Sequence, residues 1–345
     1  MTVRRAEPES LILTDVTQMP APAAVQAKPA VKAFEATTYS IILAVSICHM
    51  LNDVMQSLLS AIYPILKDDF SLKFWQIGLL TLTFQGTASL LQPVVGIYTD
   101  KRPLPMSLPF ASGFTFFGLI LLAYAPSYPL LLTGAALIGI GSSIFHPEAS
   151  RVARVASGGK FGTAQSLFQV GGNFGTALGP LLAAFVVVPL GRPAVAWFSV
   201  SALLSMAILY RVGLWYGEVR RAQAGRKPAD TTLPLARRRV MLSLVILAFL
   251  VFTKNIYTAS MSSFYIFYLM DSFGLGTQQA QLMLFLFLGA VAVGTVLGGP
   301  IGDRVGPLAV IWISILGVLP FTVLLPHANL FWTGVLTVII GVTLA

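Results

Sequence analysis

The stretch Gly96-Ile97-Tyr98-Thr99-Asp100-Lys101 returns later in the chain as Gly299-Pro300-Ile301-Gly302-Asp303-Arg304. The two copies are offset by 203 residues (303 − 100), and each follows the second apolar segment of a series. Applied without gaps, the same offset also pairs Asn52 with Asn255, Asp68 with Asp271, Phe70 with Phe273, Gln76 with Gln279 and Gly86 with Gly289. Agreement at so many spaced positions predicts a chain made of two related halves.

The composition predicts an integral membrane protein. Hydrophobic residues make up 56% of the 345 residues and charged residues only 10%, whereas soluble domains carry about 25% charged residues. Stretches of about 20 apolar residues are long enough to cross a bilayer as helices. Ten such segments are present, at about 39–66, 75–99, 106–125, 129–150, 161–189, 194–216, 240–270, 278–301, 308–326 and 328–345.

The repeat and the apolar segments together predict the fold. Six segments separate the two copies of the motif, so both halves cross the membrane in the same direction. Parallel six-helix halves, related by an axis along the membrane normal, are the architecture of the major facilitator superfamily. We therefore expect an all-α membrane protein with two such halves, of which the second is truncated, and about ten transmembrane helices. By the offset, Ala345 corresponds to residue 142, which predicts that part of helix 10 and all of helices 11 and 12 are missing.

The distribution of charge predicts how these parts lie across the membrane. Eighteen of the 22 lysines and arginines fall on the side of the N-terminus and three (Lys67, Lys73 and Arg192) on the other. Because basic loops stay in the cytoplasm, we expect a cytoplasmic N-terminus. The expected parts are a disordered cytoplasmic tail (1–36), a six-helix bundle (37–216), a basic cytoplasmic loop (217–239) and an incomplete second bundle (240–345). Since the net charge of +9 lies mostly in loops, we expect no nucleic-acid partner, and we expect a monomer.

The first apolar segment contains two ionisable residues, His49 and Asp53. A carboxylate in a membrane helix costs about 2.5–3.5 kcal/mol on insertion scales. The two residues are four apart, so they share a face of a helix. This pattern indicates proton handling or binding of a polar solute. The alternative is a structural polar pair that holds helices together.

The fourth segment ends with His146, Pro147 and Glu148. Two residues that are two apart splay by about 200° on a regular helix, so only a kink at the proline would bring His146 and Glu148 together. Either residue could take part in coupling or substrate passage. The alternative is a charge cluster that anchors the helix end at the membrane interface. No metal-binding spacing is evident in the sequence, and we expect no metal.

The fifth and seventh segments carry further candidate residues. Gln165, Gln169 and Asn173 recur at i, i+4 and i+8, which predicts a polar stripe that either lines an aqueous path or bonds a neighbouring helix. Lys254 is the one fixed positive charge within the membrane. It needs an anion, either an acid such as Asp53 or an anionic substrate, or it forms a structural ion pair.

Asn52, Asn255 and Tyr257 are further candidate substrate residues, and a glycine-rich run lies in the fifth segment. Asn255 follows Lys254 and pairs with Asn52 through the repeat, so the two asparagines are expected at one depth as a shared scaffold. Tyr257 could add a hydroxyl donor nearby. The glycine-rich run 171–180 is expected to allow close contact and sliding between the halves.

The repeated motif resembles the major facilitator signature between helices 2 and 3 and its echo between helices 8 and 9. The resemblance implies a conformational latch made by Gly96, Asp100, Lys101, Gly299, Asp303 and Arg304. Both copies depart from the fuller pattern, the first at Arg102-Pro103 and the second at Gly306-Pro307-Leu308. These departures bear on the strength of the latch.

Three segments carry a more specific resemblance. They are 49–58 (His-Met-Leu-Asn-Asp-Val-Met-Gln-Ser-Leu), 145–151 (Phe-His-Pro-Glu-Ala-Ser-Arg) and 165–173 (Gln-Ser-Leu-Phe-Gln-Val-Gly-Gly-Asn). With them the chain resembles the fosmidomycin resistance family, which are bacterial inner-membrane drug efflux transporters of the major facilitator superfamily. The run 171–180 also resembles the Gly-Pro signature of drug antiporters.

The resemblance implies a drug:proton antiporter that exports small anionic compounds such as the phosphonate fosmidomycin. Its partners would be the substrate, protons and the lipid bilayer, and no cofactor is implied. In the expected mechanism Lys254 meets the anion, while Asp53 or Glu148 takes a proton from outside, and the two events favour different rocking states of the halves. The alternatives are a permease for a native metabolite, such as a sugar or organic acid, and an inactive truncated transporter. We expect no enzyme, since no nucleophile with a base and no metal motif is evident.

Overall fold

The structure is a computed structural model that describes residues 37–102, 104–223 and 237–345. The ordered elements in this part of the chain are all helical, and each of the ten predicted segments is a helix or a series of short helices. In chain order they are α2 (Tyr39–Ala61), α3 (Tyr63–Phe70), α4 (Phe74–Lys101), α5 (Ser107–Tyr124), α6 (Tyr128–Ala156), α7 (Phe161–Leu182), η1 (Ala183–Val187), α8 (Val188–Leu190), η2 (Arg192–Phe198), α9 (Ser199–Gln223), α10 (Arg237–Phe273), α11 (Thr277–Val305), α12 (Pro307–Leu316), α13 (Val318–Leu324), η3 (Leu325–His327) and α14 (Leu330–Leu344). The expected tail (1–36) lies outside the described residues.

Eight helical stretches in the described residues are long and apolar enough to cross a membrane. Two further helices complete the predicted ten. Helix α4 has 28 residues, which at 1.5 Å per residue is longer than the roughly 30 Å hydrocarbon core, but it is diluted by Gln, Thr and Gly. Helix α14 is apolar and shorter, with 15 residues.

Three helices continue beyond the predicted apolar segments. Helix α6 passes through Pro147 and ends at Ala156, so the fourth segment is longer than 129–150. Helices α9 and α10 extend into the predicted loop, to Gln223 and from Arg237. In both places charged residues continue the helix beyond the apolar run, and hydropathy alone does not detect them.

The first predicted segment is broken near one end. Helix α2 stops at Ala61 and α3 begins at Tyr63, with Pro64 in its first turn. Proline lacks a backbone N–H and therefore starts helices well but interrupts their interior. The break leaves the carbonyl of Ala61 available for another partner, and the structure supplies one.

The glycine-rich run of α7 packs largely against α2 of the same half. A Cβ atom at Gly172 would collide with the His49 ring, one at Gly175 with the backbone of Met50, and one at Gly179 with Ser57. At these three positions the expectation of contact between the halves was wrong. The glycines instead let α2 and α7 approach closely, because only hydrogen fills the contact.

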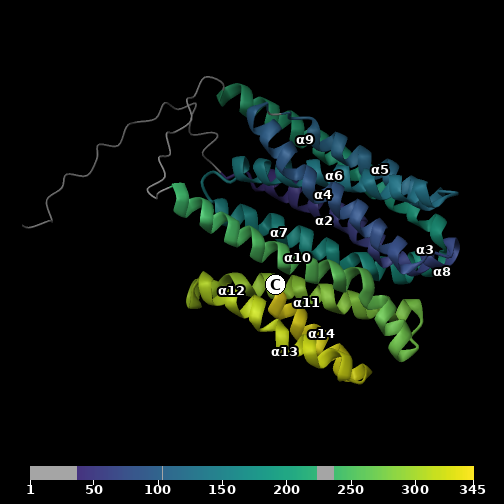
Figure 1. Cartoon of the computed structure of the whole chain (residues 1–345). Helices are drawn as coiled ribbons and strands as arrows, with labels where there is room; N and C mark the ends of the chain where they lie inside the picture. Colours follow the sequence, from purple (N-terminus) through teal and green to yellow (C-terminus); the bar gives the residue numbers. More distant parts are fainter. Residues whose placement is uncertain (1–36, 103, 224–236) are drawn as a thin grey trace, which may run out of the picture.

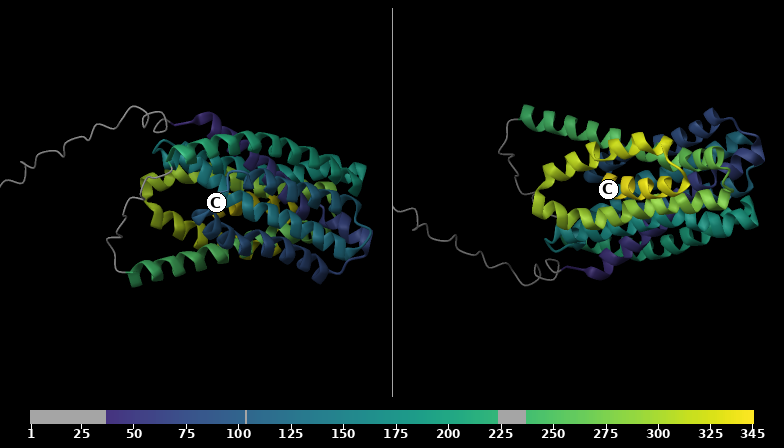
Figure 2. Two further views of the ribbon diagram at one scale, coloured as in Figure 1. Left: turned by 90° about the horizontal axis from the view of Figure 1, so that it is seen from above. Right: turned by 90° about the horizontal axis from the view of Figure 1, so that it is seen from below.

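Figure 1 shows the two sets of helices, with the first (purple to teal) above the second (green to yellow). They meet where α7 packs on α11 and α2 on α10. Figure 2 shows the same bundle from above and below, with the helices of both sets running in roughly one direction. Each set has a hydrophobic core of its own, and a few side chains such as Phe267 and Ala177 pack across to the other set.

The polar and aromatic contacts between the two sets gather at one end of the bundle. Gln281 Nε2 donates to the Ala61 carbonyl at 2.9 Å. Thr81 Oγ1 donates to Ser263 Oγ at 3.4 Å, and the rings of Phe74 and Phe267 meet edge to face. These residues lie near the ends of α2 and α10 and the starts of α4 and α11. The two halves are therefore closed against each other at this end, which is the end of α3 and α8 in Figure 1.

Candidate functional site

A cavity of about 570 Å³ lies between the two halves. Side chains of α2, α3, α4, α7, α10 and α11 line it, and most of the polar ones are hydroxyls and amides. The cavity reaches Tyr63, Thr81 and Ser263, whose side chains join in hydrogen bonds at the closed end. Asp53 is the one charged residue in its described lining. The carboxylate predicted as a site residue therefore faces the space between the halves.

Asp53 receives polar contacts from three helices. Asn52 Nδ2 and Gln56 Nε2, on its own helix, donate to Oδ1 at 3.1 and 3.2 Å. Thr176 Oγ1 of α7 donates to Oδ2 at 3.4 Å. Two imidazole rings complete the surroundings, one from α2 and one from α6.

His49 is held rigidly beside Asp53. Its Nε2 atom lies 3.3 Å from Asp53 Oδ2, and its Nδ1 atom lies 2.8 Å from the carbonyl oxygen of Phe168. The ring stacks on the Phe168 ring with centroids 4.0 Å apart. It also packs directly against Gly172, where a Cβ atom would collide with it. Only 2% of His49 is exposed.

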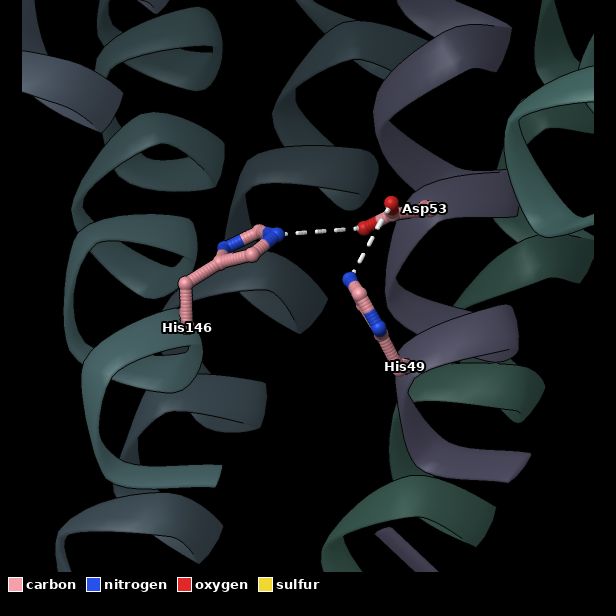
Figure 3. A group of neighbouring side chains, drawn as sticks. All are labelled: His49, Asp53 and His146. Atoms are coloured by element: carbon pink, nitrogen blue, oxygen red, sulfur yellow. Dashed lines mark ion pairs between the residues drawn. The ribbon is translucent and has the colours of Figure 1, made fainter. Parts of the chain in front are cut away.

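His146 reaches Asp53 from a different helix, α6, as Figure 3 shows. Its Nε2 atom lies 3.5 Å from Asp53 Oδ1, and 28% of its side chain is exposed. Its Nδ1 atom lies 3.0 Å from the Ser142 carbonyl oxygen. Ser142 also donates through Oγ to Gln56 Oε1 at 2.9 Å, which links α6 to α2 a second time.

These hydrogen bonds determine what the two rings present to Asp53. A carbonyl oxygen only accepts, so Nδ1 carries the hydrogen in both His49 and His146. A neutral ring of this kind has a lone pair at Nε2, which an ionised carboxylate repels. Each contact with Asp53 is therefore favourable only when a proton lies between the nitrogen and the oxygen. Besides the hydrogens on Nδ1, one proton makes one of the two contacts with Asp53 favourable, and two protons make both favourable.

The same three residues are close enough to hold a metal ion. Their ligand atoms all lie within 4.8 Å of one another, and imidazole nitrogen with carboxylate oxygen is a ligand set that zinc accepts. We define His49, Asp53 and His146 as the proton cluster, because the hydrogen-bond pattern by itself already accounts for their arrangement.

The other proton-coupling candidate, Glu148, lies in a separate cluster. It is 1% exposed and pairs with Arg151 one turn along α6. Arg151 also pairs with Asp100 at 2.5 Å and donates to Thr99 at 3.0 Å. The helix continues through Pro147, so Glu148 and His146 stay on different faces and the kink does not bring them together.

The structure shows the contacts of the first copy of the predicted latch. Asp100 meets Arg151, the backbone of Gly96 accepts from Arg151 at 3.5 Å, and Lys101 is exposed. In the second copy Arg304 is exposed. At Gly299 and Asp303 the structure describes only the helical backbone. The first copy thus ties the end of α4 to α6, within one half.

Lys254 is not brought to Asp53. It lines a second cavity of about 280 Å³, between α10 and α12 to α14, and its Nζ atom donates to the Ala345 carbonyl at 3.0 Å. Tyr257 lines the same second cavity and bonds Thr322 through its hydroxyl at 2.8 Å. Asn255 lines the central cavity instead.

The remaining candidates divide between the cluster and the surface. Asn52 is buried beside Asp53 and does not line the central cavity with Asn255. On α7, Gln165 accepts from Ser150 at 3.1 Å, Gln169 is exposed and Asn173 is half-buried. None of these three is among the residues that line the described cavities.

Three features of the site were not predicted from the sequence: Thr176, Gln85, and the role of Gln56 in joining Asp53 to Ser142. Gln56 lies three residues after Asp53, within helix-facing distance, and this spacing was an available signal. For Thr176 and Gln85 the sequence held no such signal, since both meet the site from other helices.

Comparison with known proteins settles the family. The model of the Major Facilitator Superfamily matches residues 45–345. The chain belongs to this superfamily. It is 56% identical to the fosmidomycin resistance protein of Escherichia coli (strain K12), over 96% of this chain and 81% of that protein. It is 41% identical to an uncharacterized MFS-type transporter of Bacillus subtilis (strain 168), over 85% of this chain and 72% of that protein.

Solved transporters of low sequence identity share the superfamily fold. A bacterial homologue of the human lysosomal transporter Spinster, in an inward-facing and occupied conformation, aligns with a TM-score of 0.68 at 17% identity, over 88% of this chain and 71% of that one. A D-xylose–proton symporter aligns with a TM-score of 0.64 at 17% identity, over 90% and 81%. The predicted resemblance and fold class are confirmed, and the superfamily consists of membrane transporters rather than enzymes.

Proposed function

We propose that this superfamily member is a proton-coupled exporter of fosmidomycin or related small anionic compounds, acting by alternating access in a bacterial inner membrane. The identity of 56% to a fosmidomycin resistance protein supports the substrate. The observation that carries proton coupling is the placement of Asp53, which lines the central cavity and faces two imidazoles at once. A cell with such an exporter would gain antibiotic resistance.

The proton cluster supplies a coupling mechanism. With a proton in each contact, Asp53 on α2 and His146 on α6 attract each other, and α6 is drawn toward the α2 wall of the cavity. When the proton leaves, the ionised carboxylate and the Nε2 lone pair repel. Protonation and substrate binding would therefore favour different arrangements of the cavity wall, and exchange follows from this difference.

The closed end supplies the other half of the cycle. We place it on the outer side of the membrane, because Lys67 and Arg192 lie there while Arg151 and Arg220 lie at the other end. The N-terminus is then cytoplasmic. For the outer side to open, the contacts of Gln281, Thr81 and Phe74 with the opposite half must break. The halves would then rock about the central cavity.

The test uses the purified chain in proteoliposomes loaded with buffer at a defined pH. Radiolabelled fosmidomycin should accumulate against its gradient only when the pH gradient is imposed in the direction that drives antiport, and an ionophore that removes the gradient should stop accumulation. Accumulation that is indifferent to the pH gradient would contradict proton coupling. If the proteoliposomes take up no labelled fosmidomycin, even in exchange for unlabelled fosmidomycin inside, the proposed substrate is wrong.

A second candidate is a permease for a native metabolite such as a sugar or organic acid. The observation that favours it is the hydroxyl- and amide-rich lining of the central cavity, in which Lys254 has no part. Hydroxyls and amides suit uncharged polar solutes as well as anions. The same proteoliposomes, supplied with a panel of labelled sugars and organic acids, separate the two candidates.

A further inference from the structure

The two halves do not contribute alike to the central cavity. The repeat offset of 203 residues places Asp53, Gln56 and Gln85 of the first half at the positions of Ile256, Ala259 and Leu288 in the second half. All six residues line the cavity. At these matched positions the first half supplies an acid and two amides, whereas the second half supplies only apolar side chains.

The polar groups of the first half are not equally free. Asp53 is engaged by the proton cluster, and Gln56 bonds both Asp53 and Ser142. Other hydrogen bonds engage the hydroxyls of Ser57, Ser60, Tyr63, Thr81 and Thr176 in the first half, and of Thr258 in the second. Among the described residues Gln85 takes part in none of these bonds, and its side chain is exposed in the cavity wall.

The second half offers one uncommitted amide of its own. Asn255 lines the cavity from α10, is exposed, and takes part in none of the hydrogen bonds described for the lining. An amide carries both a donor and an acceptor, so it pairs with hydroxyl, amide, carbonyl or oxyanion groups alike. Gln85 and Asn255 therefore line one cavity from opposite halves, with amide groups available to hydrogen-bond a ligand.

The charge of the cavity limits what such a site would select. Asp53 is the one charged residue in the described lining, and no lysine or arginine is part of it. Lys254 lines the other cavity. A bound anion thus has no fixed cation beside it, and its recognition has to come from hydrogen bonds and from protons held by the cluster. A volume of about 570 Å³ is within the range of small-molecule sites.

We infer that Gln85 and Asn255 form the substrate clamp of the transporter, bridging the halves through the uncharged polar groups of a small ligand. The ligand class is a compact molecule with amide, N-acyl or hydroxyl groups, and its acidic group, where present, is not held by Lys254. This inference rests on the proposed function, since it concerns the same cavity. Because such a ligand would be hydrogen-bonded to both halves, its binding would also be linked to the motion of one half relative to the other.

The experiment measures direct binding of labelled fosmidomycin to the purified full chain. Gln85→Leu gives the first half leucine, the residue that the second half carries at the matched position, Leu288. We expect the Kd of Gln85→Leu to rise about tenfold, the usual effect of removing one partner of a polar contact. Asn255→Leu should give a rise of similar size from the opposite half.

Two further variants serve as comparisons. Gln92→Leu makes the same change on the same helix at a residue outside the described cavity lining, and Lys254→Gln removes the rival anchor. Both should keep the Kd within about twofold of the original. An uncharged diester of fosmidomycin should compete equally well for binding to the original chain and to Lys254→Gln, and about tenfold less well for binding to Gln85→Leu.

The contrary outcomes are distinct. An unchanged Kd in Gln85→Leu, or an equal loss in Lys254→Gln, overturns the clamp even if proton-driven transport is intact. Binding that depends on Gln85 in a protein without proton-driven transport overturns the proposed coupling and supports the clamp. Failure of the original chain to bind fosmidomycin overturns both. Melting temperatures of all variants, measured alongside, exclude unfolding as the cause of any loss.

Discussion

The two oxygens of the Asp53 carboxylate each face the Nε2 atom of a different histidine, His49 at 3.3 Å and His146 at 3.5 Å. His49 belongs to the same helix as Asp53, whereas His146 comes from α6. One contact is thus internal to α2, and the other joins two helices. A proton that enters or leaves the second contact changes how α2 and α6 attract each other.

Replacement of His146 should remove the pH response of transport. Glutamine keeps a polar side chain but does not titrate between pH 5.5 and 8, where histidine changes its charge. We expect His146→Gln to slow proton-driven efflux about tenfold and to flatten its dependence on external pH. The measurement is the initial rate of fosmidomycin efflux from proteoliposomes across this range.

The third histidine of the chain provides the control. His327 is exposed and far from the cluster in sequence, so His327→Gln should keep both the rate and the pH profile. A pH profile in His146→Gln that matches the original chain would show that this imidazole is not part of coupling.

Gly172 should be intolerant of a side chain because of His49. A Cβ atom there would overlap the His49 ring, and overpacking of this kind costs about 1–3 kcal/mol. We expect Gly172→Ala to lower the melting temperature and to slow transport, since the ring has to move away from Asp53. Gly162→Ala, on the same helix with open space around it, should behave like the original chain. Equal melting temperatures and rates in the two variants would contradict the packing described here.

Arg151 should matter for stability because Glu148 is buried against it. Removal of one partner of a buried ion pair costs about 3–5 kcal/mol, since the other charge is left unpaired. Arg151→Ala should therefore melt well below the original chain, and the double change with Glu148→Ala should recover much of the loss. Arg154→Ala, which removes an arginine that stacks on Phe161, is the control. Full stability of Arg151→Ala would refute a structural role for this pair.

Gln281 should hold the outer end of the cavity closed. Loss of its hydrogen bond to the Ala61 carbonyl removes about 0.5–1.5 kcal/mol. In Gln281→Leu, a cysteine introduced at Ser262 in the cavity should react faster with an impermeant thiol reagent added from the outer side, while the native Cys48 is fully buried and contributes little background. Gln278→Leu, an exposed glutamine on the same helix, is the control. Equal labelling in both variants would exclude a gating role for Gln281.

Periodicity and repeats predicted the parts of the structure that depend on local sequence. The ten apolar segments became helices because a run of apolar side chains satisfies its backbone only within a helix in lipid. His49 and Asp53 were expected to meet because residues four apart share a helix face, and they lie 3.3 Å apart. Both predictions follow from spacing along one helix.

Contacts between helices could not be predicted in this way. His146 meets Asp53 only because α6 presents that face to α2, and rotation of a helix about its axis is set by packing. Lys254 was expected to face Asp53 from its depth in the membrane, but adjacent residues differ by 100° around a helix. Asn255 consequently lines the central cavity and Lys254 the other one. The direction in which each side chain points from its helix was not predictable from the sequence.

The most direct measurement compares two modes of transport in Asp53→Asn, which keeps the shape of the side chain and removes its proton chemistry. Fosmidomycin exchange across proteoliposomes at equal pH needs no net proton movement, whereas accumulation driven by a pH gradient does. We expect exchange to stay within about threefold of the original rate and proton-driven accumulation to fall about 100-fold, with Asp68→Asn, an exposed acid, keeping both. Proton-driven accumulation by Asp53→Asn at the original rate would contradict a role for the cluster in coupling.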